Sequence, residues 1–487
     1  MRKSVFILVL LFPLSLLAQS QVEAFLPMTD SVALLREYRA VWLTTLNGLD
    51  WPRTRATSAA TVEAQQQELC RTLDELQAAG INTVLFQTRV RGTVAYPSDI
   101  EPWDAAFTGT PGKSPGYDPL QFALEECHRR GMELHAWVVA FPICKFPVAK
   151  SLGSKALPAR RPELCVRSDE QWLMDPGVPE TADYLAALCR EIAERYAVDG
   201  IHLDYIRYPE RGVRFDDSRT YRRYGQGKPL AQWRRDNVTA CVRSIRNAVK
   251  QVRPWVKLSC SPVGKYADLP RQSSRGWNAR DAVAQDAVLW LREGLMDVLF
   301  PMMYFDGQHF YPFVLDWAER ADAQQVVPGL GIYFLHPREG KWELPAVERQ
   351  MQFLRARGMG GYAMFRSQFL TDNVKGLLAW THAFNRIPAL PPAVSGAPGG
   401  APPTPRFQRM ADGRSVVLKW AAVEAPSRAP IYYNVYRRQP NGALLPLSLR
   451  QDSCVFRCRP ALPALLHADY VVTAIDAYGQ ESAVGSL

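Results

Sequence analysis

Two hydrophobic patterns alternate along most of the chain. From Arg39 to Phe384, short runs rich in β-branched and aromatic residues precede longer stretches whose apolar residues recur at helical spacing. Such alternation is typical of parallel βα units. Eight runs predict strands, over residues 40–46, 83–90, 133–140, 200–208, 256–262, 297–304, 326–333 and 361–367. The clearest helices are predicted over residues 62–79, 120–130, 181–196, 231–252, 282–293, 345–357 and 373–384.

Eight βα units in about 350 residues fit a (β/α)8 barrel with enlarged loops. A doubly wound open sheet is the alternative, and such sheets usually carry a glycine-rich turn after the first strand. The segment after the first predicted strand is LTTLNGLDWP, which contains only Gly48. We therefore favour the barrel and expect this domain to extend from residue 21 to residue 389.

A second domain is predicted at the C-terminus. Residues 390–405 are rich in Pro, Gly and Ala and predict a linker. Beyond them, turn signals separate the strand-like runs SVVLKWAAV, IYYNVYRR and HADYVVTAIDAYGQES, which indicate a small all-β sandwich. Residues 406–487 resemble an immunoglobulin-like fibronectin type III module. Because such modules space, dock or bind, we expect this domain to contact an envelope protein partner and to contribute no catalytic residue.

The N-terminus has the pattern of a secretory signal peptide. Arg2 and Lys3 precede an apolar run from Val5 to Ala18, and small and polar residues follow, which predicts cleavage after Ser20. A membrane anchor is the alternative, but the run is shorter than the roughly 20 residues that a spanning helix needs. No other stretch is apolar enough to span a bilayer. We expect an exported protein, periplasmic or extracellular, with no membrane span in the mature chain.

Charge and cysteine content narrow the function only slightly. The formal charge falls from +10 to +8 when Arg2 and Lys3 leave with the signal peptide, which weakly favours polyanionic partners. Nucleic acid is not an expected partner of an exported protein. Nine cysteines leave at least one thiol unpaired; Cys454 and Cys458 could form a disulfide, but their spacing fits no standard zinc site. No metal or cofactor is expected, since P-loop, dinucleotide and H-E-x-x-H motifs are missing.

The most informative segment is VDGIHLDYIRYP, residues 198–209, which predicts a buried parallel strand ending in a carboxylate. Strand alternation places Gly200, His202 and Asp204 on one face, which would point into the barrel. An unpaired buried carboxylate is costly and is usually kept for a purpose at this end of a barrel strand. Asp204 is therefore the first catalytic candidate, with His202 placed to orient it. An aspartate capping the following turn fits this segment equally well.

Hydrolysis of a glycosidic bond needs one acid and one base or nucleophile, so a second carboxylate is required. Asp306, after the sixth strand, is the most economical partner for Asp204 across the barrel mouth. Glu101, in the loop after the second strand, is the third candidate. The alternative for Asp306 is a turn aspartate that precedes Gly307.

Aromatic and basic residues near the strand ends are the candidates for binding sugar. Flat rings with polar tips suit the faces of sugar rings, and arginines bind hydroxyls or carboxylates or pair with neighbouring acids. Trp42 and Trp137 are the rings most expected to belong to the core, and buried-strand histidines are more often core groups than ligands. The candidate substrate-binding residues are Arg39, Trp42, Arg89, Tyr96, Trp103, His135, His202, Tyr205, Tyr304 and Arg366.

Four long motifs carry a family resemblance over residues 37–384. They are REYRAVWLTTLNGLDWP, NTVLFQTRVRGTVAYPSDIEPW, GMELHAWV and VDGIHLDYIRYP. Together they resemble the bacterial glycosyl-hydrolase-like family ten. The resemblance implies a (β/α)8 glycosidase of the bacterial envelope, and the better understood members look like hydrolases of peptidoglycan glycan strands, especially strands without stem peptides. The positions that match the family are Arg39, Trp42, Arg89, Tyr96, Glu101, Trp103, His135, His202 and Asp204.

The sequence departs from the family at two places. Many relatives have two consecutive acids in the fourth-strand motif, whereas Tyr205 follows Asp204 here. The third-strand motif ends in VVAFP rather than in an Asn-Pro-Tyr run, which would alter a sugar subsite. In the similar chitinase motif the catalytic glutamate would stand at Ile206, so catalysis from that position is excluded.

Two functions from different classes follow. We favour an exported endo-acting glycoside hydrolase. The alternative is a carbohydrate-binding barrel without turnover that acts as an envelope scaffold and docks through its sandwich. A second carboxylate within about 10 Å of Asp204 distinguishes the two, because the ordinary mechanism needs that pair.

Overall fold

A closed barrel of eight parallel strands forms the larger part of the computed structural model, which describes residues 34–413, 415–460 and 466–484. The sheet order is β11-β10-β9-β5-β3-β2-β13-β12, and parallel bridges from Leu299 to Val326 and from Met302 to Gly329 close the ring. The predicted (β/α)8 architecture is confirmed. The strands are β2 (Tyr38–Leu43), β3 (Thr83–Val90), β5 (Glu133–Val139), β9 (Gly200–Asp204), β10 (Lys257–Cys260), β11 (Val298–Leu299), β12 (Gly329–Leu330) and β13 (Gly361–Met364).

Most barrel strands are shorter than the sequence predicts, and three of them lose four residues or more. β9 ends at Asp204 and not at residue 208, because Tyr205 adopts a left-handed backbone with a φ of 49°. β11 and β12 each keep only two residues in the ladder, where runs of eight are predicted. The apolar runs in the sequence therefore continue beyond the last hydrogen-bonded residues of these strands, into the loops at the barrel mouth.

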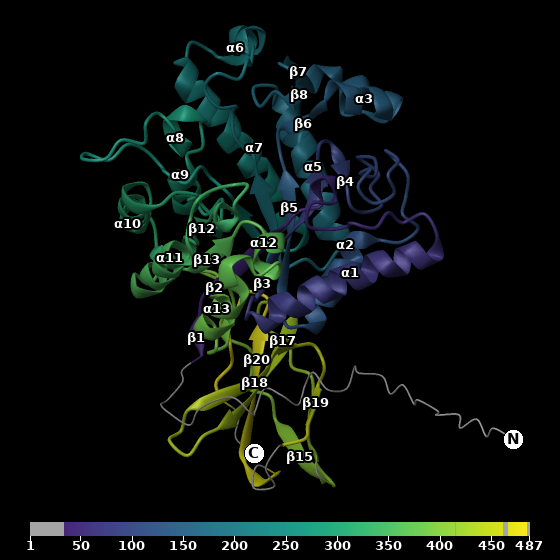
Figure 1. Cartoon of the computed structure of the whole chain (residues 1–487), viewed down its shortest axis with the longest axis vertical. Coiled ribbons are helices and arrows are strands. Elements are labelled where there is room, and N and C mark those ends of the chain that lie inside the picture. Colours follow the sequence, from purple (N-terminus) through teal and green to yellow (C-terminus); the bar gives the residue numbers. More distant parts are fainter. Residues whose placement is uncertain (1–33, 414, 461–465, 485–487) are drawn as a thin grey trace, which may run out of the picture.

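Helices cover the outside of the barrel (Figure 1). The apolar positions on the outward faces of the strands, such as Val41, Val84 and Ile201, pack against helix residues such as Leu69 and Leu73 in one continuous core. Of the predicted helix over residues 282–293, only residue 282 and residues 287–292 are helical, in two separate short helices. The helices between and after the barrel strands are α1 (Ala59–Ala78), α2 (Pro119–Arg129), α5 (Pro179–Arg195), α7 (Leu230–Val252), α8 (Ala279–Ala282), α9 (Ala287–Arg292), α10 (Tyr311–Arg320), α11 (Leu344–Ala356), α12 (Ser367–Thr371) and α13 (Leu377–Phe384).

The loops after the second to fourth strands carry additional structure at one end of the barrel, opposite the sandwich (Figure 1). A three-stranded antiparallel sheet, in the order β6-β8-β7, rises there after β5. This sheet is not among the predicted elements. These elements are β4 (Thr93–Val94), β6 (Pro142–Lys145), α3 (Phe146–Leu152), α4 (Leu157–Arg160), β7 (Cys165–Ser168), β8 (Gln171–Met174) and α6 (Ser218–Tyr224).

The C-terminal domain is the expected β-sandwich. Two three-stranded antiparallel sheets, β15-β16-β19 and β18-β17-β20, enclose a core that includes Val416, Leu418, Val435 and Val472. The fibronectin type III assignment stays a prediction. The strands are β15 (Phe407–Asp412), β16 (Ser415–Trp420), β17 (Ile431–Arg438), β18 (Leu444–Gln451), β19 (Val455–Cys458) and β20 (Asp469–Asp476). Before them, β14 (Ala389–Leu390) pairs with β1 (Leu35–Arg36).

Buried charges join the sandwich to the N-terminal end of the barrel. Arg450 of β18 donates to Asp199 at 2.7 Å and lies 3.2 Å from Glu133, and all three side chains are almost completely buried. Glu133 also bonds Lys257 Nζ at 2.5 Å, and His128 Nε2 lies 2.8 Å from Asp199. Because the sandwich closes this end, any open site of the barrel lies at the other end.

The predicted signal peptide, residues 1–20, lies outside the described residues. Within the described part of the chain, no helix has both the length and the apolar character needed to cross a bilayer.

Candidate functional site

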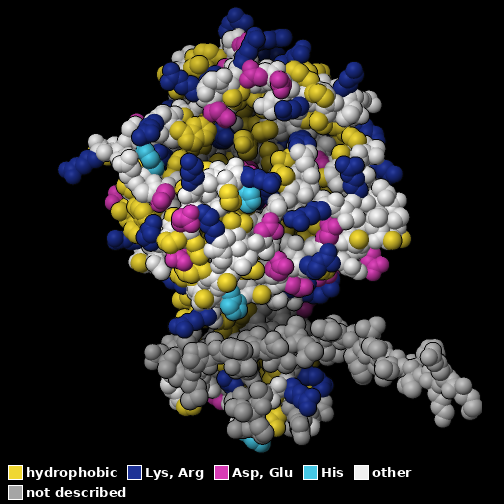
Figure 2. Space-filling view, in the orientation of Figure 1, with side chains coloured by type: hydrophobic (Ala, Val, Ile, Leu, Met, Phe, Trp, Pro, Cys, Tyr) yellow, Lys and Arg dark blue, Asp and Glu magenta, His cyan; other side chains and the backbone are white. Residues whose placement is uncertain are grey.

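A pocket of about 610 Å³ opens at the C-terminal ends of β2, β3, β5, β9 and β10. Figure 2 shows hydrophobic side chains gathered around a hollow in the upper half of the barrel domain. Residues of β8 and the segment after β9 form its outer wall. The aromatic lining residues are Trp42, Trp137, Phe141, Tyr205, Tyr208, Phe215, Tyr304 and Phe365. A pocket with mostly apolar walls and a few convergent polar groups is the usual form of a small-molecule site.

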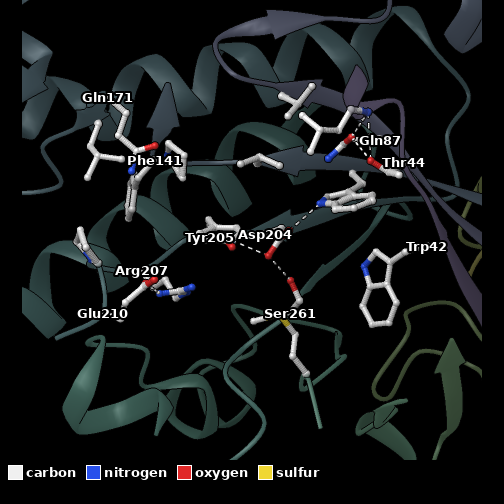
Figure 3. A pocket seen from close by; sticks show the side chains of 18 of the residues that line it. Trp42, Thr44, Gln87, Phe141, Gln171, Asp204, Tyr205, Arg207, Glu210 and Ser261 are labelled. Atoms are coloured by element: carbon white, nitrogen blue, oxygen red, sulfur yellow. Dashed lines mark hydrogen bonds and ion pairs between the residues drawn. The ribbon is translucent and has the colours of Figure 1, made fainter. Parts of the chain in front are cut away.

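Asp204 is the acid in the floor of this pocket (Figure 3). Its Oδ2 accepts a hydrogen bond from Trp137 Nε1 at 3.1 Å, and its Oδ1 accepts from Ser261 Oγ and from the Tyr205 backbone N–H, both at 2.8 Å. The residue is 6% exposed. Burial raises the pKa of Asp204, although the three donors and the charge of Arg207 oppose that rise. A buried carboxyl group of this kind can hold a proton and donate it to a bound ligand.

The backbone after β9 turns the next side chains toward the pocket mouth. Tyr205, in its left-handed conformation, presents a ring that is 41% exposed. The Arg207 guanidinium lies 4.5 Å from the centre of that ring and forms an ion pair with Glu210 at 3.1 Å. The alternative of an aspartate that caps the following turn describes only one of the three bonds of Asp204, the one from the Tyr205 N–H at the bend after β9, since the other two come from Trp137 and Ser261. Glu210 is the second carboxylate in the lining.

A layer below the pocket fixes the ring of Trp42. Trp42 Nε1 donates to His202 Nε2 at 3.1 Å, and His202 Nδ1 lies 3.0 Å from Ser259 Oγ. Burial lowers the pKa of His202 well below its ordinary value, so the imidazole is neutral and donates from Nδ1 to the serine. His202 therefore holds Trp42 in place and does not line the pocket itself. Tyr304 contacts the Trp42 ring edge to face and does line the pocket.

Thr44, Gln87 and Arg366 contribute polar groups to the pocket wall. Gln87 Oε1 accepts from Thr44 Oγ1 at 2.7 Å and from the backbone N–H groups of Thr45 and Leu46. These bonds orient the Gln87 side chain, which lines the pocket (Figure 3). Arg366 forms an ion pair with Asp50 and donates to Gln368 Oε1 at 3.0 Å. Of the predicted binding residues, Trp42, Tyr205, Tyr304 and Arg366 therefore come together with Asp204.

Glu101 and Arg89 lie outside the pocket and neutralise each other. The Arg89 guanidinium binds the Glu101 carboxylate through two bonds of 2.8 and 2.6 Å, and both side chains are completely buried. Tyr184 of α5 adds a third bond to Glu101 at 2.9 Å. The pair ties β3 to the following loop and to α5, which is a structural role.

Asp306, the predicted second catalytic residue, is exposed. Its side chain accepts from Gly307 N at 2.7 Å and caps the short 3₁₀ helix Gly307–His309. The turn alternative therefore describes its geometry, and Asp306 does not line the pocket. Tyr96 also lies elsewhere, bonded to Glu191 at 2.8 Å, and Trp103 forms a backbone bridge with Val94 outside the lining.

Arg39 and His135 lie at the opposite, N-terminal end of the barrel. Arg39 is fully buried and donates to Glu37 at 2.7 Å and to the Asn385 carbonyl at 3.0 Å. His135 Nε2 lies 3.1 Å from Glu133 at the start of β5. In this structure both residues belong to the closed end and not to the pocket.

Sequence reasoning missed the groups that surround Asp204. Strand alternation could have found Ser261, because it follows Ser259 by two residues at the end of a neighbouring strand. The same rule applies to Trp137, which was expected in the core but donates to Asp204. Glu210 carried no periodic signal, since it stands in a loop whose path depends on Tyr205 and Arg207.

Comparisons with known proteins match this chain to one protein family. The family model described as glycosyl hydrolase-like 10 matches residues 37–335. Glycosyl hydrolase DigH of Escherichia coli strain K12 is 34% identical over 286 residues, and the match spans 55% of this chain but only 65% of that protein. Glycosyl hydrolase YngK of Bacillus subtilis strain 168 is 29% identical over 433 residues, or 83% of either chain.

A solved structure extends the likeness to the fold. The glycoside hydrolase domain of PgaB (BpsB) from Bordetella bronchiseptica superposes with a TM-score of 0.52 over 73% of this chain and 99% of that domain. The sequence identity is 14%, so the likeness concerns the barrel and not the chemistry.

Proposed function

We propose, from the premise that this chain belongs to the glycosyl hydrolase-like 10 family, that it is an exported glycoside hydrolase of peptidoglycan glycan strands that lack stem peptides. Family membership makes it a glycosidase-like protein that acts on carbohydrate. One observation carries the catalytic part of the proposal. Asp204, a buried carboxyl group with a raised pKa, stands at the floor of an aromatic-lined pocket at the C-terminal end of the barrel.

Asp204 acts as the general acid in this proposal. Burial raises the pKa of Asp204, which favours the protonated form that can pass its proton to the oxygen of the scissile bond. The resulting carboxylate is stabilised by donors already in place, namely Trp137 Nε1, Ser261 Oγ and the Tyr205 N–H. Because these donors need not move during proton transfer, the barrier avoids the cost of reorganising solvent.

Glu210 supplies the second carboxylate. It lines the same pocket, forms an ion pair with Arg207 at 3.1 Å, and acts in this proposal as the base or nucleophile. The stereochemistry of the product identifies the role of Glu210, since a nucleophile retains the anomeric configuration and a base inverts it.

The pocket walls support a carbohydrate substrate. Trp42, Tyr205 and Tyr304 present aromatic surfaces on which sugar rings can stack, and Gln87 and Arg366 provide polar groups for hydroxyls. The identity of the glycan follows from the family resemblance of the motifs. Export follows from the predicted signal peptide, which places the enzyme in the periplasm or outside the cell with the envelope polymer.

The test uses the chain from Gln21 onward and peptide-free peptidoglycan glycan strands. Wild type should release soluble oligosaccharides, whereas Asp204→Asn and Glu210→Gln should release none above background. Asp306→Asn is the matched control and should keep wild-type activity, because Asp306 only caps a 3₁₀ helix at the surface. Loss of activity in the control would restore Asp306 to the catalytic pair.

A binding barrel without turnover is the second candidate. The ion pair between Glu210 and Arg207 favours it, because a guanidinium on the carboxylate restrains its reaction with substrate. The two candidates separate in one assay. If wild type retains the strands on a pull-down but releases no product, the binding function replaces the hydrolytic one.

A further inference from the structure

A second cavity, of about 460 Å³, lies beside the aromatic pocket on the same end of the barrel. Its residues come from the segments that follow β2, β3 and β4 and from α3, all of which are on the C-terminal side of the strands. Three arginines line it, Arg53, Arg55 and Arg91, together with one acid, Asp104. We call this cavity the arginine pocket.

The charges of these arginines are not neutralised within the protein. Among the described residues, none of the three forms an ion pair; Arg91 Nη1 instead donates to Asn47 Oδ1 at 2.8 Å. Asp104 gives its oxygens to its own loop, accepting from Thr93 Oγ1 at 2.5 Å and from Ala106 N at 2.7 Å. The arginine pocket therefore carries a net positive charge.

The absence of a side chain at Gly109 shapes one wall. A Cβ atom there would lie 2.9 Å from Arg55 Cδ and 3.0 Å from its Nη1, so a larger residue would push the arginine side chain away from this backbone. Gly109 also has a φ of 80°, which L side chains rarely adopt. Arg55 is thus packed along the cavity wall although it is exposed to solvent.

Neighbouring residues of the same segments line the two cavities. Leu46 and Leu49 face the aromatic pocket, while Asn47 and Gly48 between them face the arginine pocket. Likewise Val90 lines the first cavity and Arg91 the second. A polymer bound across Asp204 therefore meets the arginine pocket within a short distance along its chain.

We propose that the arginine pocket is an anionic subsite that binds a carboxylate carried by a sugar of the bound strand, close to the bond cleaved. This inference rests on the proposed function, since it assigns a second contact to the same substrate. Guanidinium groups bind carboxylates through paired, charge-assisted hydrogen bonds, and three of them around one cavity favour an anion over a neutral sugar. The occupant is an acidic glycan.

A preference of the arginine pocket for a carboxylate would distinguish peptidoglycan strands with and without stem peptides. Its muramic acid sugars carry a lactyl carboxyl group that is converted to an amide when a stem peptide is attached. Only a strand without peptides presents that group as a free carboxylate. The arginine pocket would therefore select strands whose peptides have been removed, and it would do so by charge as well as by space.

The experiment measures binding in an Asp204→Asn background, so that cleavage does not consume the ligand. Titration calorimetry at low ionic strength compares peptide-free glycan strands with the same strands after carbodiimide coupling of methylamine, which turns each carboxylate into an amide. Three charge contacts close to solvent should together change the affinity about tenfold. We therefore expect the amidated strands to bind about tenfold more weakly than the acidic ones.

Replacement of all three arginines, Arg53→Gln with Arg55→Gln and Arg91→Gln, should produce the same loss and abolish the distinction between the two ligands. The matched control replaces three exposed arginines outside both cavities, Arg271, Arg338 and Arg349, by Gln. It removes the same net charge and should leave the distinction intact. Far-ultraviolet circular dichroism and melting temperature check that each variant is folded.

Equal binding of acidic and amidated strands by the Asp204→Asn protein would overturn the inference, as would an equal loss in the control. Sodium phosphate that displaces the strands far better than sodium acetate, at matched ionic strength, would contradict a carboxylate subsite and indicate a phosphate site. The proposed function is judged separately by product release from wild type. If wild type releases product but the protein binds acidic and amidated strands equally, only the arginine-pocket inference is wrong. If the protein distinguishes the two ligands but wild type releases no product, only the proposed hydrolysis is wrong.

Discussion

The hydrogen bond from Ser261 to Asp204 offers a direct test of the proton on that carboxyl group. Ser261 Oγ lies 2.8 Å from Asp204 Oδ1, and both residues are buried. The bond stabilises the ionised carboxylate and so lowers the pKa of Asp204 against the larger effect of burial. A hydrogen bond to a charged group contributes about 1.5–3 kcal/mol. At about 1.4 kcal/mol per unit, Ser261→Ala should raise the pKa of Asp204 by about 1–2 units.

The sign of the kinetic effect follows from the role of Asp204. A general acid works only while protonated, so kcat/KM falls as pH rises through its pKa in the free enzyme. Ser261→Ala should therefore move the alkaline limb of the kcat/KM profile to higher pH. Ser259→Ala is the control, because that hydroxyl contacts His202 and not Asp204, and its limb should not move. A Ser261→Ala profile that stays in place or moves to lower pH would refute the assignment of Asp204 as the acid.

Three further predictions concern stability and the reassigned residues. Arg450→Met should lower the free energy of unfolding, measured by urea denaturation, by about 3–5 kcal/mol, because the buried carboxylates of Glu133 and Asp199 lose their guanidinium partner. Arg438→Met is the control: it breaks the exposed ion pair with Asp469 and should lower the free energy of unfolding by less than about 1 kcal/mol. Glu101→Gln should likewise lower the melting temperature but leave kcat unchanged; a large loss of kcat in folded protein would return Glu101 to the site. Burial lowers the pKa of His128, but the charge of Asp199 and its hydrogen bond outweigh burial, so the pKa is raised in the folded protein. His128 therefore stabilises the fold below about pH 6.5, and this contribution is lost as pH rises through the folded pKa. His128→Gln should flatten the dependence of stability on pH, and an unaltered slope would contradict this account.

The periodic signals of the sequence predicted the barrel and the place of Asp204. Strand alternation and the rule that barrel sites form at strand C-termini together led to Asp204, and the pocket lies there. Those rules act on regular structure, where side-chain direction follows from position. They do not predict the antiparallel sheet after β5, whose short strands belong to an insertion between two βα units of the barrel.

The errors concern residues whose role depends on a partner or on loop geometry. Arg89 was a candidate because it lies near the end of a strand, and Glu101 because it stands in the loop after that strand, yet the two side chains form an ion pair and neutralise each other. His135 lies opposite Gly200, the first residue of β9, in the sheet register, so it belongs to the closed end; single-strand patterns do not contain that register. Glu210 enters the site only because the chain reverses at Tyr205, which no periodicity encodes.

Product release from peptide-free glycan strands by wild type and by Asp204→Asn tests the central claim most directly. Reducing ends and mass spectra of the soluble fraction would be recorded for both proteins at equal concentration, after circular dichroism has shown that both are folded. The account predicts soluble oligosaccharides from wild type and none from the variant. Equal release by the two proteins would contradict the assignment of Asp204 as the catalytic acid, and release by neither would contradict the proposed hydrolysis itself.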